Sequence, residues 1–317
     1  MRIALKVDVD TLRVTHEGVP ALLRLFDRYR VRATFLWSLG PDHTGRALRR
    51  VFRRGFLRKV GRTSVLSHYG IKTLLYGVLL PGPMIGQRSV DVLRAAHQAG
   101  HESGLHCYDH VAWQDHVARQ GEAWTQRTLQ QAREIHETLL GIPPTTHGAA
   151  GWQLNAHLLA MEEAWGLPYA SDTRGTHPFL PVLAGRAFAT PQWPTTLPTL
   201  DELLGLDGVD PHNVHERVLA CSRQPQEHGH VYTLHAELEG MKLLAVMETL
   251  LKAWQAEGFA VGSLADSWQA VADHNRRHGT TLPHHALVWG EVPGRSGVLA
   301  LQGGAWQGDT PLQDKGL

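Results

Sequence analysis

The sequence predicts an α/β protein whose parallel strands form a closed or nearly closed barrel of about seven strand–helix units. Strand-like apolar alternation recurs between stretches of helical period along most of the chain. Such alternation implies parallel strands joined by right-handed crossovers. No glycine-rich dinucleotide-binding motif follows the first strand, which favours a barrel over a doubly wound sheet.

The elements follow in order from the first strand, at residues 3–9, where Ile3, Leu5, Val7 and Val9 alternate with other residues. Further strands are predicted at residues 31–37, 102–105, 145–149, 169–172, 231–236 and 259–263. Helices are predicted at residues 17–30, 90–99, 122–140, 154–165, 214–222 and 241–257. Two segments do not fit this alternation: a long insertion at 41–87 and a glycine-rich, irregular or short-stranded tail at 283–317. No clear linker separates them from the rest, so we expect one domain over residues 1–317.

The bulk composition is that of a soluble globular protein, with 43% hydrophobic and 19% charged residues among 317. The net charge of +1 excludes a polyanion binder that acts through the whole surface. Two lone cysteines, Cys107 and Cys221, indicate a reducing compartment. We expect neither a signal peptide, since the first strand begins at Ile3, nor a membrane-spanning segment.

Two carboxylates, Asp8 and Asp10, lie at the carboxyl end of the first predicted strand. Alternate residues of a strand share a face, and barrel enzymes place their chemistry at the carboxyl ends of the strands. One of the two could simply cap the following helix. However, two carboxylates on one face are costly unless a cation or deep solvation separates them, so we expect a functional role.

His106 and His110 are spaced i, i+4, which brings both imidazoles to one side of a helical turn. Two imidazoles and a carboxylate make a three-ligand metal site with an open position, as in catalytic zinc centres. The chain holds 21 histidines, so the spacing alone could arise by chance. Its place at the end of a predicted strand, on the same rim as Asp8 and Asp10, favours a metal site.

His235 ends another predicted strand on this rim. It could act as a general acid because the pKa of histidine lies near neutrality, although a buried histidine bonded to backbone is an alternative. Asp172 could hydrogen-bond to His235 and hold it protonated, and Arg174 could bind a carboxylate such as Asp8. Alternatively, Asp172 and Arg174 form a surface ion pair with each other.

These motifs occur together, in order, as KVDVDT, GLHCYDHVAWQ, AAGW, SDTRG and TLHAELEG. In this set the chain resembles, over nearly its whole length, the polysaccharide deacetylase (NodB-homology) family of metal-dependent amide hydrolases. With TFLWSLGPDHTGR added, it is most similar to the branch that deformylates undecaprenyl-phosphate-linked 4-deoxy-4-formamido-L-arabinose. The resemblance implies a distorted (β/α) barrel and a role in lipid A modification and polymyxin resistance.

The resemblance also implies the roles of single residues. Five positions match the family's site: the base Asp8, the metal ligands Asp10, His106 and His110, and the acid His235. The implied metal is zinc, with cobalt, nickel or manganese as alternatives. The chain departs from the family at the third motif, where Arg-x-Pro is replaced by residues 147–149, HGA. The arginine that orients the base is therefore missing there, and we expect Arg174 to supply it.

The insertion carries a basic segment, RALRRVFRRGFLRKVGR at residues 46–62, with apolar side chains at helical spacing. Such a segment is typical of an interfacial helix on anionic lipid, with a solvated face or a nucleic-acid patch as alternatives. A lipid-linked substrate favours the membrane. We therefore expect no nucleic-acid partner and a cytoplasmic enzyme that is peripheral on the inner face of the inner membrane.

Other function classes remain open. A DxD motif also binds metal–nucleotide in many glycosyltransferases, but that hypothesis leaves His106, His110 and His235 without a role. A deacetylase of another N-acetylated sugar would use the same residues. A catalytically inactive carbohydrate-binding relative is disfavoured, because it has no reason to retain base, ligands and acid together.

Overall fold

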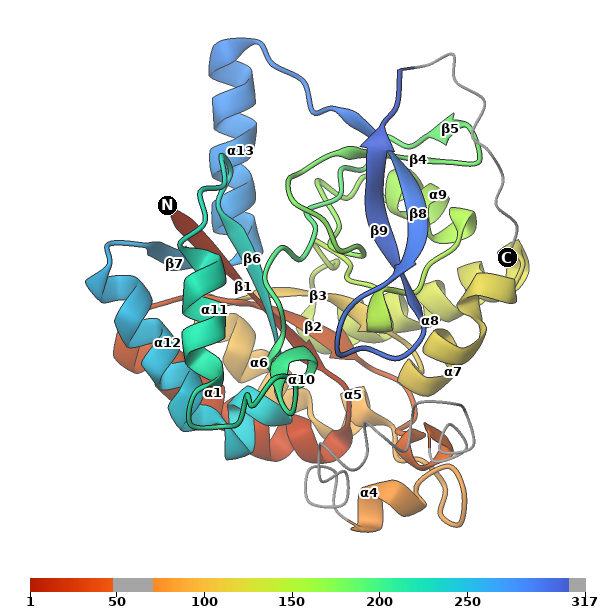
Figure 1. The fold of residues 1–317 in the computed structure, drawn as a ribbon. Coiled ribbons are helices and arrows are strands. Elements are labelled where there is room, and N and C mark those ends of the chain that lie inside the picture. Colours follow the sequence, from red (N-terminus) through yellow and green to blue (C-terminus); the bar gives the residue numbers. More distant parts are fainter. Residues whose placement is uncertain (48–70, 308–317) are drawn as a thin grey trace.

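The computed structural model describes residues 1–47 and 71–307, and helices surround a wall of parallel strands (Figure 1). The strands of this wall are β1 (Arg2–Val9), β2 (Thr34–Ser38), β3 (Glu102–Cys107), β6 (His230–His235) and β7 (Ala260–Gly262). Their order is β3-β2-β1-β6, and β7 pairs with the start of β1. All these pairings are parallel. The predicted α/β class is confirmed.

The wall continues past β3 through segments that are too irregular to count as strands. Backbone contacts lead along them from β3 back to β6: the Leu105–His147 bridge, Ser171 N–H to His147 O (2.7 Å), Trp193 N–H to Ala170 O (2.7 Å) and Thr196 N–H to Val231 O (3.1 Å). The wall thus closes into a distorted barrel, as the sequence predicted. The strands predicted at residues 145–149 and 169–172 are wrong as regular strands, but both segments do occupy positions in the wall.

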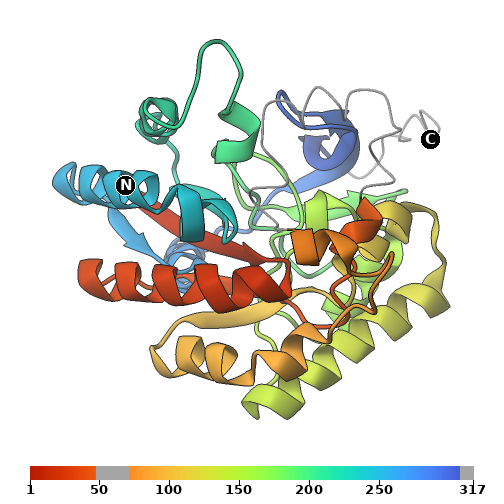
Figure 2. The same ribbon diagram turned by 90° about the horizontal axis from the view of Figure 1, so that it is seen from below.

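Helices cover the outside of the wall (Figure 2). The longer ones are α1 (Leu12–Tyr29), α6 (Val90–Gln98), α8 (Glu122–Leu140), α9 (Ala156–Ala164), α11 (Val214–Ser222), α12 (Leu244–Ala256) and α13 (Leu264–His278). Short helical turns are α4 (Ile71–Leu75), α5 (Ile85–Arg88), α7 (His110–His116), η2 (Val117–Arg119), η3 (Ala150–Trp152), α10 (Leu200–Leu203) and η4 (Leu238–Lys242). α1 begins earlier than predicted because the Thr11 side chain accepts a hydrogen bond from the Val14 N–H (3.2 Å).

Alternate side chains along β1 point to opposite sides of the wall, into the main core or into the barrel. Ile3, Leu5, Val7 and Val9 are fully buried in the main core cluster, together with apolar residues of α1 and α12. The alternate side chains, Lys6, Asp8 and Asp10, face the inside of the barrel and are also buried. Charged groups inside a barrel require partners, and these partners build the site described below.

A second sheet packs beside the barrel, with the order β5-β4-β8-β9. Its strands are β4 (Leu180–Leu183), β5 (Arg186–Ala187), β8 (His284–Glu291) and β9 (Val298–Ala305). The expected irregular or short-stranded tail is thus corrected over most of its length to an antiparallel hairpin of two eight-residue strands. Leu287 and Ala300 bury this hairpin in a second core cluster. Residues 48–62 of the basic segment and 308–317 of the tail lie outside the described residues.

Candidate metal centre and catalytic groups

Three of the predicted ligands converge at the carboxyl end of β1. His106 Nε2 lies 3.3 Å from Asp10 Oδ1, and His110 Nε2 lies 3.2 Å from Asp10 Oδ2. One ligating atom from each of the three residues falls within 4.8 Å of the others. Such a set, with two imidazoles and one carboxylate, has the composition of a site for a divalent transition metal.

Local structure aims each ligand at this point. His106 lies near the end of β3, and its Nδ1 donates to the Gly148 carbonyl (2.6 Å), which leaves Nε2 to face Asp10. His110 is the first residue of α7, which begins where the Asp109 side chain accepts from the Ala112 N–H (3.0 Å). The HxxxH spacing therefore joins a strand end to the first turn of a helix, rather than two positions of one helix.

The electrostatics of the cluster fit a bound cation. Burial, with Glu237 and Asp8 nearby, raises the pKa of Asp10 well above its ordinary value, although Arg295 opposes the rise. Burial lowers the pKa of His106 to about 4, which keeps its imidazole neutral as a ligand must be. Asp10 Oδ1 is buried without a hydrogen-bond partner among the described residues. A divalent ion held by Asp10, His106 and His110 would satisfy this oxygen.

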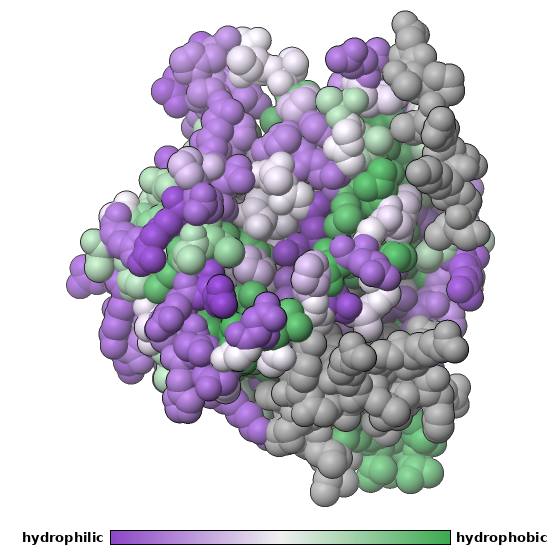
Figure 3. Space-filling model, viewed as in Figure 1, coloured by the Kyte–Doolittle hydropathy of each residue, from purple (hydrophilic) through white to green (hydrophobic). Residues whose placement is uncertain are grey.

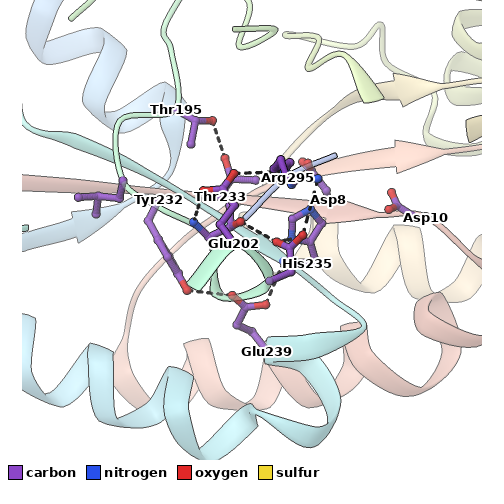
Figure 4. A network of polar contacts seen from close by, with 12 residues as sticks. Asp8, Asp10, Thr195, Glu202, Tyr232, Thr233, His235, Glu239 and Arg295 are labelled. Atoms are coloured by element: carbon purple, nitrogen blue, oxygen red, sulfur yellow. Dashed lines mark hydrogen bonds and ion pairs between the residues drawn. The ribbon is translucent and has the colours of Figure 1, made fainter. Parts of the chain in front are cut away.

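Asp8 and His235 flank the cluster from neighbouring strands. They are direct register partners between β1 and β6, and Figure 4 shows them side by side. Asp8 Oδ2 lies 3.9 Å from His106 Nε2, so the carboxylate borders the ligand set. His235 Nδ1 lies 3.6 Å from Asp201 Oδ1, an ion-pair distance too long for a hydrogen bond. A carboxylate and an imidazole thus stand next to a candidate metal centre.

Asp172 does not contact His235, and that prediction is wrong. Its Oδ1 accepts instead from His147 Nδ1 (2.7 Å) and from the Ala149 N–H (2.7 Å), and its Oδ2 accepts from Gln192 Nε2 (2.8 Å). The irregular course of residues 169–172 turns the side chain toward His147 rather than toward β6. Asp201 in α10, rather than Asp172, lies at ion-pair distance from His235 Nδ1.

Arg174 does not pair with Asp8, and this prediction is corrected as well. Its Nη1 donates to Glu202 Oε1 (2.6 Å), and its guanidinium lies over the Trp152 ring at 5.1 Å from the centroid. The alternative of a surface pair with Asp172 is also wrong, since both side chains are occupied elsewhere.

Arg295, from the β8–β9 loop, is the arginine whose charge acts on Asp8. It lies over Trp152 (4.3 Å), and its Nε donates to Glu202 Oε1 (3.1 Å). Burial works against its charge, but Asp201, Glu202 and Asp8 raise the pKa of Arg295 above its ordinary value. Its Nη2 is buried without a hydrogen-bond partner among the described residues. Figure 4 shows Arg295 next to Asp8.

Sequence reasoning missed Arg295 and Asp201 because neither belongs to a recognisable motif. Arg295 lies in a glycine-rich stretch that was expected to be irregular. A usable signal for Asp201 existed in TLDE at residues 199–202, a capping box that places acidic side chains in the first turn of α10.

Comparison with known proteins identifies relatives of the chain. No protein-family model matches the chain. Over 250 residues the chain is 37% identical to the "Probable 4-deoxy-4-formamido-L-arabinose-phosphoundecaprenol deformylase ArnD" of Shewanella sediminis, a match that covers 79% of this chain and 80% of that protein. A protein of the same name from Wigglesworthia glossinidia brevipalpis is 29% identical over 289 residues, which cover 91% of this chain and 98% of the relative.

Solved structures share the fold. One from Mycobacterium smegmatis, described as a polysaccharide deacetylase, aligns with a TM-score of 0.59 at 18% identity and covers 89% of this chain and 92% of that one. Another from Pseudomonas aeruginosa PAO1, described in the same way, aligns with a TM-score of 0.55 at 16% identity over 88% and 93% of the two chains. The chain therefore has the polysaccharide-deacetylase barrel and belongs to the 4-deoxy-4-formamido-L-arabinose-phosphoundecaprenol deformylase (ArnD) family.

Proposed function

We propose that this protein is a metal-dependent amide hydrolase that removes the formyl group from undecaprenyl-phosphate-linked 4-deoxy-4-formamido-L-arabinose. The observation that carries the proposal is the convergence of Asp10, His106 and His110 beside the register pair Asp8–His235. The name of the relatives supports the substrate. The product would be the free aminoarabinose lipid used in lipid A modification, which confers polymyxin resistance.

The ligand set supports zinc as the resident metal, with cobalt, nickel or manganese as alternatives, because two imidazoles favour borderline transition metals over magnesium or calcium. A divalent metal held by Asp10, His106 and His110 would supply Lewis-acid chemistry, polarising the substrate carbonyl and lowering the pKa of water. His106 is oriented for this role by its hydrogen bond to Gly148 O, and Asp10 supplies the negative charge.

Two residues of the chain move protons. Asp8 accepts a proton from the water that attacks the formyl carbon. Its Oδ1 is buried and has no hydrogen-bond partner among the described residues. The C–N bond breaks as His235 donates a proton to the departing C4 amine, giving formate and the amine. Asp201 Oδ1, 3.6 Å from His235 Nδ1, places a carboxylate beside this imidazole. Arg295 takes the orienting role that the sequence assigned to Arg174.

The substrate and an exposed apolar turn of the insertion both support membrane association. Val78, Leu79 and Leu80 follow α4 and are 51%, 76% and 39% exposed. Figure 3 shows hydrophobic side chains gathered at this corner of the molecule. In the sequence, this apolar turn follows the basic segment 46–62, and together they would suit an anionic lipid surface. In the described ranges, no helix is both long and apolar enough to span a bilayer.

The decisive experiment incubates the Zn²⁺- or Co²⁺-loaded protein with formamido- and acetamido-arabinose lipid phosphates and measures formate and acetate release. We expect formate only. Asp8→Asn should lower turnover on the order of 10²–10⁴-fold while metal stays bound. The exposed Asp91→Asn variant is the matched control. Acetate release at a comparable rate would indicate a deacetylase instead, and an Asp8→Asn variant of near-normal rate would refute the base assignment.

The membrane part is tested separately by co-sedimentation of the full chain with vesicles of phosphatidylglycerol and phosphatidylcholine. We expect binding to the anionic vesicles that weakens when residues 46–62 are deleted and when Leu79 is replaced by serine. Val298→Ser, at a site 41% exposed in β9, is the control. Unchanged binding of the deletion variant would refute membrane docking through this segment.

A further inference from the structure

A second cluster of His and carboxylate side chains lies next to residues 147–149, which contact His106 of the metal centre. His147, Glu162 and Asp172 are each 0% exposed. His147 Nδ1 lies 2.7 Å from Asp172 Oδ1 and 3.1 Å from Glu162 Oε1. Three titratable groups buried together are costly, and neither their chemistry nor their burial serves the proton transfers described above. Their presence in the core needs a separate explanation.

The hydrogen bonds of this cluster converge on Asp172. Both oxygens of Asp172 already accept N–H donors, from His147, the Ala149 backbone and Gln192. Burial works to lower the pKa of His147, but Asp172 and Glu162 raise it to about 9 overall. Burial and the neighbouring Asp172 raise the pKa of Glu162 well above its ordinary value. His147 Nε2 and Glu162 Oε1 are buried without a hydrogen-bond partner among the described residues, so Asp172 is the member of the cluster whose two oxygens both accept hydrogen bonds.

The cluster is connected to the metal centre through three consecutive residues. Asp172 Oδ1 accepts from His147 Nδ1 and from the Ala149 N–H, both at 2.7 Å. Gly148, between these two anchored residues, points its carbonyl at His106 Nδ1 (2.6 Å). The Gly148 N–H in turn donates to the Leu105 carbonyl (2.9 Å), beside His106 in β3. The Asp172 carboxylate thus binds the residues on both sides of Gly148. The Gly148 carbonyl in turn fixes the tautomer and the ring orientation of His106.

We propose that Asp172 is a positioning residue, which clamps the Gly148 carbonyl through His147 and Ala149 and thereby orients His106 toward the metal. Gln192 holds the clamp from the other side, since its Nε2 donates to Asp172 Oδ2 (2.8 Å) and its Oε1 accepts from the Asp172 N–H (2.9 Å). Glu162 contacts His147 but receives no hydrogen bond from the 147–149 backbone. The inference rests on the proposed function only in taking His106 as a metal ligand.

The test measures Co²⁺ affinity of the full chain by competition with a chromophoric chelator, beside thermal stability. Asp172→Asn should weaken Co²⁺ binding on the order of 10–100-fold, the usual effect of losing a group that orients a metal ligand. Glu162→Gln should weaken it less than about threefold, since the backbone clamp stays in place. His136→Asn is the control for the loss of a buried polar contact, because His136 is likewise 0% exposed and its partners, Ser103 and Ile142, lie outside the clamp.

A second readout follows the ring of His106 directly. In ¹⁵N–¹H spectra of histidine side chains, the Nδ1–H of His106 should be protected from exchange in the wild type and in His136→Asn. It should exchange rapidly in Asp172→Asn. If Asp172→Asn does not fold, Gln192→Met loosens the same carboxylate without adding or removing a charge, and it should weaken Co²⁺ binding severalfold.

Each outcome separates the two proposals. If the wild type binds Co²⁺ and Asp10→Asn does not, while Asp172→Asn binds as tightly as the His136→Asn control, the clamp is refuted and the proposed function stands. If Co²⁺ affinity merely tracks the loss of thermal stability across all variants, the cluster is structural and the clamp is again refuted. If the wild type binds no divalent metal at all, the proposed function fails first.

Discussion

Gly148 packs tightly against Leu36 and Lys6, and its carbonyl accepts a hydrogen bond from His106 Nδ1. Replacing Gly148 with alanine tests whether this packing supports the metal centre. A Cβ at this position would lie 2.3 Å from Leu36 Cδ1 and 3.1 Å from Lys6 Cε. Ordinary carbon–carbon contacts are about 3.5–4.0 Å, so Leu36 would have to retreat by about 1 Å or more. It has little room, because Leu36 is 0% exposed.

The Lys6 side chain cannot easily give way either. Its Nζ donates to the Ser171 carbonyl (2.7 Å), and the side chain is fully buried. Overpacking of this kind costs about 1–3 kcal/mol of the free energy of unfolding. We expect Gly148→Ala to lose about 2 kcal/mol. We also expect weaker Co²⁺ binding, because the strain falls on the carbonyl that holds His106.

The assay is urea unfolding of the apo protein together with a Co²⁺ titration, for Gly148→Ala, Leu36→Val and the double variant. Leu36→Val removes the methyl that the new Cβ would strike, so the double variant should be more stable than the sum of the single changes by about 1–2 kcal/mol. Strict additivity, or a Gly148→Ala variant as stable as the wild type, would refute the packing argument.

Three further predictions concern the charges of the site and of the core. Arg295→Met should lower turnover on the order of 10²-fold with little change in KM, because the charge of Arg295 acts on Asp8. Arg174→Met should have a smaller effect on turnover, and steady-state kinetics of the two variants test this difference. Burial lowers the pKa of His101 from 6.5 to about 4, so the unfolded chain takes up the proton first and stability should fall as the pH drops from about 6.5 to 4, by at most about 1.4 kcal/mol per pH unit. His101→Asn should flatten this part of a urea-unfolding pH series, and an unchanged slope would contradict the assignment. Removing metal with a chelator should lower the free energy of unfolding by about 2.7 kcal/mol, relative to protein in free metal at 100 times the dissociation constant of the metal. In calorimetry, Asp10→Asn should show no such difference.

Much of the fold could be predicted because its signals are local. Apolar alternation marks β1, and helical period marks α8 and α11 at the bounds that the structure shows. The strand-end placement of Asp8, Asp10, His106 and His235 follows from the same patterns, since the carboxyl ends of parallel strands meet on one rim. Their positions at strand ends were enough to predict that these four side chains lie near one another.

Only the tertiary structure decided which side chains contact the residues of the site. The wall segments at 145–149 and 169–172 are held by isolated backbone contacts rather than by a regular ladder, so periodicity could not place Asp172 or Arg174. The arginine beside Asp8 comes from a hairpin whose glycines obscure any strand pattern, almost three hundred residues after β1. A side chain's partner across such a distance depends on where two buried surfaces meet, and that is set by packing in three dimensions rather than by neighbours in the chain.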